Sequence, residues 1–356
     1  MNIRTRALSA AIAPFADAAL ILSETNRFYY TGFAASDGAL LVSPALTVFY
    51  TDSRYTEAAE NKLGKEAVRD SGRLYEDLAA VFESNGIERV AIEADRVTLS
   101  QFVELQKKLP GVTLVSDDAL TKEINAERAV KAPEEVGAIV EAQRIAERAL
   151  DTVLGLIRPG MTEKEIALKL EYEMLSKGAE ALSFETICVS GANSSLPHGV
   201  PGNKKVENGD FITMDFGAVV RGYHSDMTRT VALGRADGEM RRVYATVLEA
   251  QTAALAAMAD GTTCFDADKA ARDVIGNAGY GAYFGHGTGH GVGVEIHEKP
   301  NVSPRGADTL KTGNVVTAEP GIYLPGRFGV RIEDMALITA SGCENLTKAP
   351  KELIIL

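Results

Sequence analysis

An internal repeat constrains the fold of this chain more than any other feature. The segment VENGDFITMDFG (206–217) aligns without a gap with LKTGNVVTAEPG (310–321), and two glycines and one threonine coincide. Each copy has the pattern of a buried strand and is followed by a turn and a returning strand. The two copies and their returning strands carry four acids: Asp215, Asp226, Glu319 and Glu333. We therefore predict one domain of two similar halves, with one acid on each of four strands.

The four acids are expected to point into the protein, because the strands that carry them are otherwise apolar. Carboxylates that face one another inside a protein repel unless a cation lies between them. Lysine is nearly absent from these strands, and Arg331, which we place on the same strand face as Glu333, supplies only one charge. Two divalent metal ions would balance all four acids. The alternative is an acid cluster that is neutralised by arginines or exposed to solvent.

A second segment, GHGTGHGVGVEIHE (285–298), holds three of the five histidines: His286, His290 and His297. Glycine at every second position disfavours a helix, since each costs about 1 kcal/mol relative to alanine. Such glycines indicate close backbone approach or unusual dihedral angles. One imidazole from this segment would complete a carboxylate shell suited to Mn²⁺, Co²⁺, Fe²⁺ or Zn²⁺. The pattern alone leaves open which histidine it is, and a tight loop with solvated histidines is the alternative.

Length, charge and cysteine content restrict the classes of protein. A chain of 356 residues is long enough for two domains. The net charge of −12 argues against nucleic acid as a partner. No run approaches 18 uninterrupted apolar residues, so no membrane span is expected, and a short first helix is expected after Arg4 and Arg6. Three distant cysteines suit the reducing cytoplasm and exclude a disulfide framework.

The pattern of elements divides the chain into two predicted domains, 1–125 and 126–356, with a boundary near 122–132. The first reads as an α/β domain of alternating strands and helices. Its strands are expected at AALILS (18–23), ALLVS (39–43), LTVFYT (46–51) and RVAIEA (89–94). Its helices are expected at 54–64, 75–86 and 98–111. The second begins with long helices, the first starting at Pro133, and Thr162 with Glu165 forms a predicted capping box.

Together these motifs resemble the M24 "pita-bread" metallopeptidases, and among them the Xaa-Pro peptidases. The resemblance rests on TMDFGAVVRGYHSDMTRT (213–230), the glycine–histidine segment, VVTAEPGIY (315–323) and GVRIEDMALI (329–338). TNRFYYTGF (25–33) and FYTDSRYTEAA (49–59) are similar to the creatinase-type N-terminal domain of that family. The resemblance covers nearly the whole chain. It implies a creatinase-like α/β domain followed by an α+β pita-bread domain with a pseudo-twofold repeat.

The resemblance also implies roles for individual residues. The metal ligands would be Asp215, Asp226, His290, Glu319 and Glu333, which hold two divalent ions, Mn²⁺ first and Co²⁺ or Zn²⁺ as alternatives. Glu319 would also take the proton of the attacking water, and His198 and His297 would hold the substrate carbonyl and the tetrahedral intermediate.

Other residues near the site have roles with open alternatives. His286 would lie near the proline pocket or support the loop, and Tyr323 would contact substrate or pack. Arg331 is expected to orient Glu333. His224, in the turn RGYHSD (221–226), has no role from the family and is expected to be solvated or to support a ligand.

One position departs from the family pattern. Many prolidases of the family carry an arginine where this chain has Asn301, and that arginine binds the free carboxylate of the dipeptide. We therefore expect an aminopeptidase that cleaves Xaa-Pro bonds at the N-termini of longer, proline-containing peptides, with a prolidase as the alternative. A prolidase would need another cation, for which Arg27 and Arg54 are the candidates.

Two other classes share the fold: a metal-free, creatinase-like hydrolase of a small amidine and a non-catalytic binding module. The complete set of five ligands argues against both. The family further implies a homodimer, and the composition a cytoplasmic enzyme.

Overall fold

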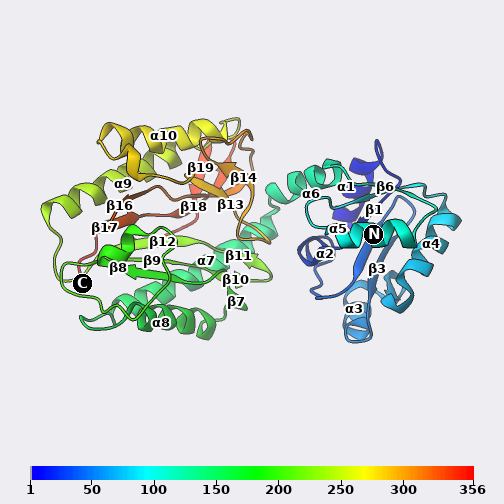
Figure 1. Ribbon diagram of the computed structural model, residues 1–356, viewed down its shortest axis with the longest axis horizontal. Coiled ribbons are helices and arrows are strands. Elements are labelled where there is room, and N and C mark those ends of the chain that lie inside the picture. The colour runs from blue at the N-terminus through cyan, green and yellow to red at the C-terminus, as the bar shows by residue number, and fades with distance from the viewer. Residues whose placement is uncertain (1) are drawn as a thin grey trace. The chain divides into compact units, whose positions relative to one another are not determined.

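The structure is a computed structural model that describes residues 2–356. The chain divides into two compact units, Met1–Arg128 and Ala129–Leu356. Figure 1 shows the elements of each unit, and we describe the two units separately. Among the described residues, no helix is long and apolar enough to cross a membrane.

The first unit is built on one mixed sheet of six strands, in the order β4-β3-β2-β1-β5-β6. The strands are β1 (Ala18–Ile21), β2 (Ala39–Val42), β3 (Thr47–Thr51), β4 (Val68–Asp70), β5 (Arg89–Ile92) and β6 (Thr113–Val115). The helices are α1 (Ile3–Ile12), α2 (Glu24–Thr31), α3 (Thr56–Leu63), α4 (Leu74–Asn85), α5 (Leu99–Lys108) and α6 (Ala119–Ala129). The four predicted strands, the three predicted helices and the short first helix are confirmed, whereas α2, α6, β4 and β6 were not predicted.

The second unit has a pair of helices on each side of its strands (Figure 1). Its helices are α7 (Pro133–Leu154), α8 (Glu163–Ser176), α9 (Gly238–Ala257) and α10 (Cys264–Asn277). Helices α7 and α8 share one apolar core with β8 (Ile187–Ser190), β9 (Phe211–Phe216) and β12 (Met227–Ala232). Helices α9 and α10 share another core with the strands of the second half. The capping box at Thr162 and Glu165 and the helix start at Pro133 are confirmed.

The strands of the second half complete a five-stranded sheet and a separate hairpin. The sheet has the order β14-β13-β15-β18-β19. Its strands are β13 (Gly289–Gly291), β14 (Glu298–Val302), β15 (Val315–Ala318), β18 (Asp334–Thr339) and β19 (Gly342–Asn345). Strands β16 (Gly321–Leu324) and β17 (Phe328–Arg331) form the hairpin. The first half has its own small sheet of β7 (Ala181–Leu182), β10 (Ala218–Val220) and β11 (Tyr223–His224).

The sequence repeat is a structural repeat. Strand β9 pairs antiparallel with β12 in the first half, as β15 pairs antiparallel with β18 in the second. The aligned glycines Gly209 and Gly313 have φ angles of 99° and 91°, and Gly222 and Gly326 have φ angles of 72° and 71°. These left-handed conformations favour glycine, which explains why glycine stands at equivalent places in both copies. The predicted order of an α/β domain followed by an α+β domain with an internal repeat is confirmed.

Two local predictions were wrong. The chain leaves the strand after Arg331 and enters β18 only at Asp334, so Arg331 and Glu333 do not lie on one continuous strand. The reason is that the backbone N–H of Glu333 donates to the carbonyl of Thr228 in the other half, which interrupts the local pairing. Of the four acids only Asp215 lies within a strand, and the other three flank strand ends.

Candidate metal centre and substrate cavity

A cavity of about 510 Å³ lies in the second unit, where the two halves meet. Its walls include the four acids of the repeat and all the predicted histidines of the site. The predicted site residues that line it are His198, Asp215, Asp226, His286, His290, His297, Asn301, Glu319, Arg331 and Glu333. Tyr323 is buried, and its hydroxyl forms hydrogen bonds with two of these residues. It accepts from Arg331 and pairs with His286 Nε2. The structure therefore brings together residues that are up to 135 positions apart in the chain.

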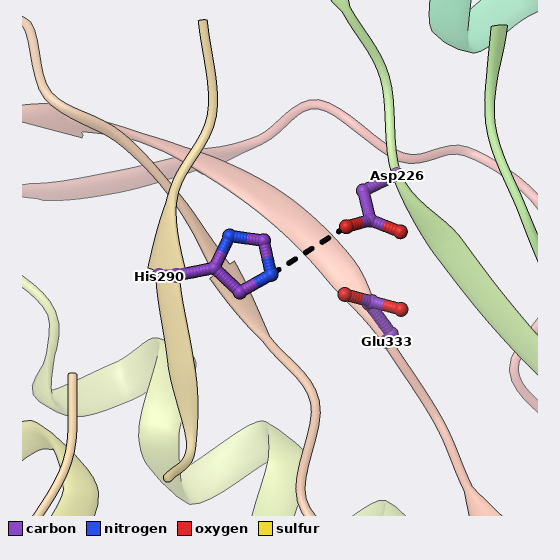
Figure 2. Close-up of side chains that lie close together, drawn as sticks. All are labelled: Asp226, His290 and Glu333. Carbon is purple, nitrogen blue, oxygen red and sulfur yellow. Dashed lines mark ion pairs between the residues drawn. The ribbon is translucent and has the colours of Figure 1, made fainter. Parts of the chain in front are cut away.

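Three of these side chains are close enough to hold one ion. Ligand atoms of Asp226, His290 and Glu333 all lie within 4.8 Å of one another. Figure 2 shows the His290 ring extending from its strand towards the two carboxylates, which come from the ends of other strands. Asp226 is contributed by the first half, and His290 and Glu333 by the second. The site therefore depends on the association of the two halves.

His290 presents a lone pair to carboxylates. Its Nδ1 lies 3.1 Å from the carbonyl of Gly291, and with the proton assigned there, Nε2 is left unprotonated. This Nε2 lies 3.6 Å from Asp226 Oδ2 and 3.5 Å from Glu319 Oε1. Burial lowers the pKa of His290 to about 4, so the ring is neutral at pH 7. A lone pair that faces two carboxyl groups at this distance fits either a cation between them or a proton on a carboxyl group.

The glycines beside His290 are required by close approach of neighbouring chains. His290 lies in the short strand β13, which pairs with β14 on one side and β15 on the other. A Cβ on Gly289 would lie 2.0 Å from the carbonyl oxygen of Thr317, and one on Gly291 would lie 2.2 Å from that of Lys299. Glycine thus lets the strand enter a crowded sheet. The segment is in part a strand, which the sequence pattern did not predict.

The carboxylates are destabilised by burial and by one another. Burial, and then the negative charges of neighbouring acids, raise the pKa of Asp226 and of Glu333 well above the usual range. Burial raises the pKa of Glu319 to about 8. Asp215 Oδ1 is buried without a hydrogen-bond partner. Buried acids in this state, together with a neutral imidazole, fit divalent cations bound among them.

These pKa shifts predict that the stability of the metal-free protein depends on pH. The raised pKa of Glu319 contributes stability that is present below pH 4.5 and is lost as pH rises through 8. The lowered pKa of His286 and of His290 contributes stability that is present above pH 6.5 and is lost as pH falls towards 4. The raised pKa values of Asp226 and Glu333 act in the same direction as that of Glu319, so chelated protein should lose stability as pH rises above 6.5, where the histidines contribute no further gain.

We expect the melting temperature of chelated protein to fall by about 5 °C or more between pH 6.5 and pH 9, since each kcal/mol shifts Tm by about 2–4 °C in a domain of this size. Melts followed by circular dichroism measure it. The melting temperature of metal-loaded protein should fall less over the same pH range, because bound cations stabilise the ionised acids. If the melting temperature of a chelated Glu319→Gln variant fell as steeply with pH as that of wild type, the assignment of this pH dependence to Glu319 would be wrong.

Arg331 binds Asp215 directly and reaches Glu333, the residue it was predicted to orient, only through Thr228. Its Nη2 lies 2.5 Å from Asp215 Oδ2, and its other donors bind Thr228 Oγ1, the carbonyl of Pro197 and Tyr323 Oη. Glu333 is instead held by Thr228, whose hydroxyl donates to Glu333 Oε2 over 2.7 Å. Thr228 was missed, although its position two residues after Asp226 on one strand pointed to it.

The remaining predicted residues differ in how they are held. His286 Nε2 lies 2.8 Å from Tyr323 Oη and its Nδ1 lies 2.8 Å from the carbonyl of Gly287, so the ring is fixed at the cavity wall. The ring of His297 is 4.3 Å from that of His290, centroid to centroid. His198 is exposed and lies at the cavity rim. The contacts of Tyr323 favour its predicted packing role over contact with substrate.

Three residues with open roles lie outside the cavity wall. His224 is half-buried and its Nδ1 lies 2.9 Å from Ser183 Oγ, so it is not solvated as one alternative proposed. Arg27 is buried and its guanidinium donates to the carbonyls of Leu22, Ala35 and Gly38. It is therefore not available for a substrate carboxylate without loss of those bonds. Arg54 is exposed and paired with Asp52.

Several wall residues had no signal in the sequence. Phe184, Ile187 and Ile296 supply apolar surface, and Glu185 and Ser303 supply polar groups. Ile296 lies in the glycine–histidine segment beside His297, whereas the other four belong to no motif, and only the folded chain brings them to the acids.

Comparisons with known proteins agree with this architecture. The model of metallopeptidase family M24 matches residues 137–340, and that of the creatinase/prolidase N-terminal domain matches residues 5–130. The Xaa-Pro dipeptidase of Pyrococcus horikoshii is 37% identical over 95% of this chain and 94% of its own. The structure of the Xaa-Pro dipeptidase from Bacillus anthracis is 38% identical, with a TM-score of 0.95 and 99% of each chain covered. That of the X-Pro aminopeptidase from Thermotoga maritima is 38% identical, with a TM-score of 0.92 over 99% of this chain and 100% of that one.

Proposed function

The chain belongs to metallopeptidase family M24, and on that premise we propose that this metallopeptidase is an Xaa-Pro dipeptidase with two divalent ions in its site. The observation that carries the proposal is the cluster of four acids, two buried and two half-buried, with one neutral imidazole in the cavity wall. The similarity to Xaa-Pro dipeptidases over nearly the full length supports the substrate class. Release of proline from Ala-Pro by the purified, metal-loaded protein tests it.

We assign the ligands as Asp215, Asp226, His290, Glu319 and Glu333. Asp226 and Glu333 are buried, and their ligand atoms lie within 4.8 Å of each other and of that of His290, so these three side chains would hold an ion together. Mn²⁺ is our first candidate, with Co²⁺ and Zn²⁺ as alternatives that suit the same mixed oxygen and nitrogen donors. When bound, such ions polarise a carbonyl and make water more acidic, which favours hydrolysis of an amide at neutral pH.

The side chains around the ions supply the proton transfers and hydrogen bonds. Glu319 takes the proton of the attacking water, because burial raises the pKa of its carboxyl to about 8, which suits a group that accepts a proton near neutral pH. His198 and His297 face the same cavity from opposite halves and donate hydrogen bonds to the developing oxyanion. Arg331 keeps Asp215 in place through a buried ion pair.

A preference for longer peptides, our expectation from the sequence, has less support than the dipeptide, but one observation keeps it as a second candidate. Among the described wall residues only Arg331 has a permanent positive charge, and all of its nitrogens are engaged. The free carboxylate of a dipeptide would therefore meet neutral donors such as Asn301 and Ser303, or an imidazole. The ratio of kcat/KM for Ala-Pro to that for Ala-Pro-Ala separates the two candidates, and a ratio below one would make the enzyme an aminopeptidase.

Replacement of Asn301 by arginine should shift this ratio towards the dipeptide. A hydrogen bond to a charged group is worth roughly 1–2 kcal/mol more than a neutral one, so we expect a gain of about tenfold in the ratio. Parallel assays of wild type and Asn301→Arg on both peptides measure it. Asn301→Gln, which stays neutral, is the control and should leave the ratio near the wild-type value. An unchanged ratio in Asn301→Arg would show that the carboxylate does not bind at this position.

The homodimer and the cytoplasmic location complete the proposal. Both remain predictions, which size-exclusion chromatography with light scattering and cell fractionation would test.

A further inference from the structure

The loop that carries His198 has no regular structure of its own beyond one short turn. It runs from the end of β8 at Ser190 to Gly202, and we call residues 191–201 the His198 loop. Within residues 2–356 the imidazole of His198 makes no hydrogen bond, and the residue is exposed. The place of this ring at the cavity rim therefore depends on how the loop itself is held.

One buried carboxylate binds both ends of the loop. Glu163, the first residue of α8, is fully buried. Its Oε1 accepts from the backbone N–H of Ser190 over 2.7 Å and from Ser190 Oγ over 3.0 Å. Its Oε2 accepts from the backbone N–H of Gly202 over 3.2 Å. Asn193, inside the loop, donates to both oxygens over 3.1 and 3.3 Å.

The far side of the loop is held by the second half of the domain. The backbone N–H of Gly329 donates to Ser194 Oγ over 2.9 Å. Arg331 donates to the carbonyl of Pro197, next to His198, over 3.2 Å. The same guanidinium binds Asp215, so the His198 loop and a candidate metal ligand share one support. Glu163 supplies the corresponding support from the first half.

We propose that Glu163 is a positioning residue for the hydrolysis: by holding both ends of the His198 loop it places the His198 imidazole at the cavity. This inference rests on the proposed function, because it takes the role of His198 from there. Glu163 does not line the cavity, so any effect on turnover must pass through the loop. A displacement of about 1 Å in a catalytic group can cost about 10²-fold in rate.

Glu163→Gln is the test substitution because it keeps the shape and removes one acceptor. All the groups around the carboxylate are donors, and a glutamine amide has only one oxygen. Its NH₂ group must face either Ser190 or Gly202, so one end of the loop loses its partner. The matched control is Glu165→Gln on the same turn of α8, because Glu165 is exposed and binds only Thr162.

We expect kcat for Ala-Pro to fall 10- to 100-fold in Glu163→Gln, with KM and metal content close to wild type, and less than twofold in Glu165→Gln. Hydrogen exchange should be faster at residues 190–202 in Glu163→Gln alone. In a His198→Ala background, Glu163→Gln should reduce kcat by less than twofold, since both changes act on one group. The proposal would be overturned if the two substitutions lowered kcat additively, or if kcat of Glu163→Gln fell only in proportion to its folded fraction.

The outcome is separable from that for the proposed function. If wild type does not hydrolyse Xaa-Pro peptides, the proposed function fails, and with it the role of Glu163 in catalysis. If wild type is active and Glu163→Gln is as active as Glu165→Gln, the proposed function stands and the positioning role is wrong. Should Glu163→Gln fail to fold, Asn193→Ala removes a donor from the loop and leaves α8 intact. Asn193→Ala should then lower kcat about threefold or more, and an unchanged kcat would overturn the proposal.

Discussion

Removal of metal should abolish hydrolysis of Xaa-Pro peptides, lowering kcat/KM by about 10³-fold or more. Among the described residues of the cavity wall only Arg331 carries a permanent positive charge, so the ionised form of the four acids requires bound cations. Lewis-acid stabilisation of a developing oxyanion is worth several kcal/mol, and each 1.4 kcal/mol or so is a factor of ten in rate. Dialysis against a chelator followed by assay on Ala-Pro measures the loss.

The same experiment separates the alternatives that share this fold. Addition of Mn²⁺ or Co²⁺ should restore activity, and elemental analysis should find about two ions per chain at full activity. A chelated protein that remains fully active while metal analysis finds no ion would make the chain a metal-free hydrolase. Two bound ions without any peptide hydrolysis would point to the non-catalytic module.

Replacement of His290 by alanine should have the second largest effect, because it removes the only nitrogen donor that we assign to the ions. Its Nε2 lies between Asp226 and Glu319, and alanine leaves those carboxylates without that partner. Loss of an outer partner of a ligand already costs about 10- to 100-fold in affinity or activity, and we expect at least that in kcat/KM. Metal content after dialysis should fall in parallel.

His224→Ala is the control for this substitution. His224 is also a half-buried histidine of the second unit, but its ring binds Ser183 and does not line the cavity. Its variant should retain metal and most of its activity. Equal loss of metal from the two variants would show that the wrong histidine was assigned.

Much of the site could be predicted from sequence because the acids lie in a repeat. Asp215 and Glu319 occupy equivalent places in two aligned segments. Because an ionised carboxylate is costly to bury without a positive partner, acids on buried strands predict a shared cation. Gly209 and Gly313 have similar positive φ angles, so the repeated glycines in the sequence reflect the same left-handed backbone conformation in both copies. The first unit was predictable for a similar local reason, since short apolar runs alternate with helices that end in glycine or proline.

The partners of these residues were not predictable from local patterns. Arg331 was expected to orient Glu333, but its direct carboxylate partner is Asp215, and it reaches Glu333 only through Thr228. The strand pattern is interrupted between β17 and β18, where the backbone N–H of Glu333 donates to the carbonyl of Thr228 in the other half. Such a contact joins residues 105 positions apart, and no periodicity within one strand contains it.

The sequence by itself determined the four acids, their twofold arrangement and the family, because these follow from spacing along strands and from repeated motifs. The spacing left open which histidine completes the cluster, although the resemblance pointed to His290, and it left open how the loops are held. The tertiary structure shows how His290 comes to lie beside Asp226, since β13 enters the sheet between β14 and β15. It also placed Glu163 where both ends of the His198 loop meet, a convergence that exists only once the chain is folded.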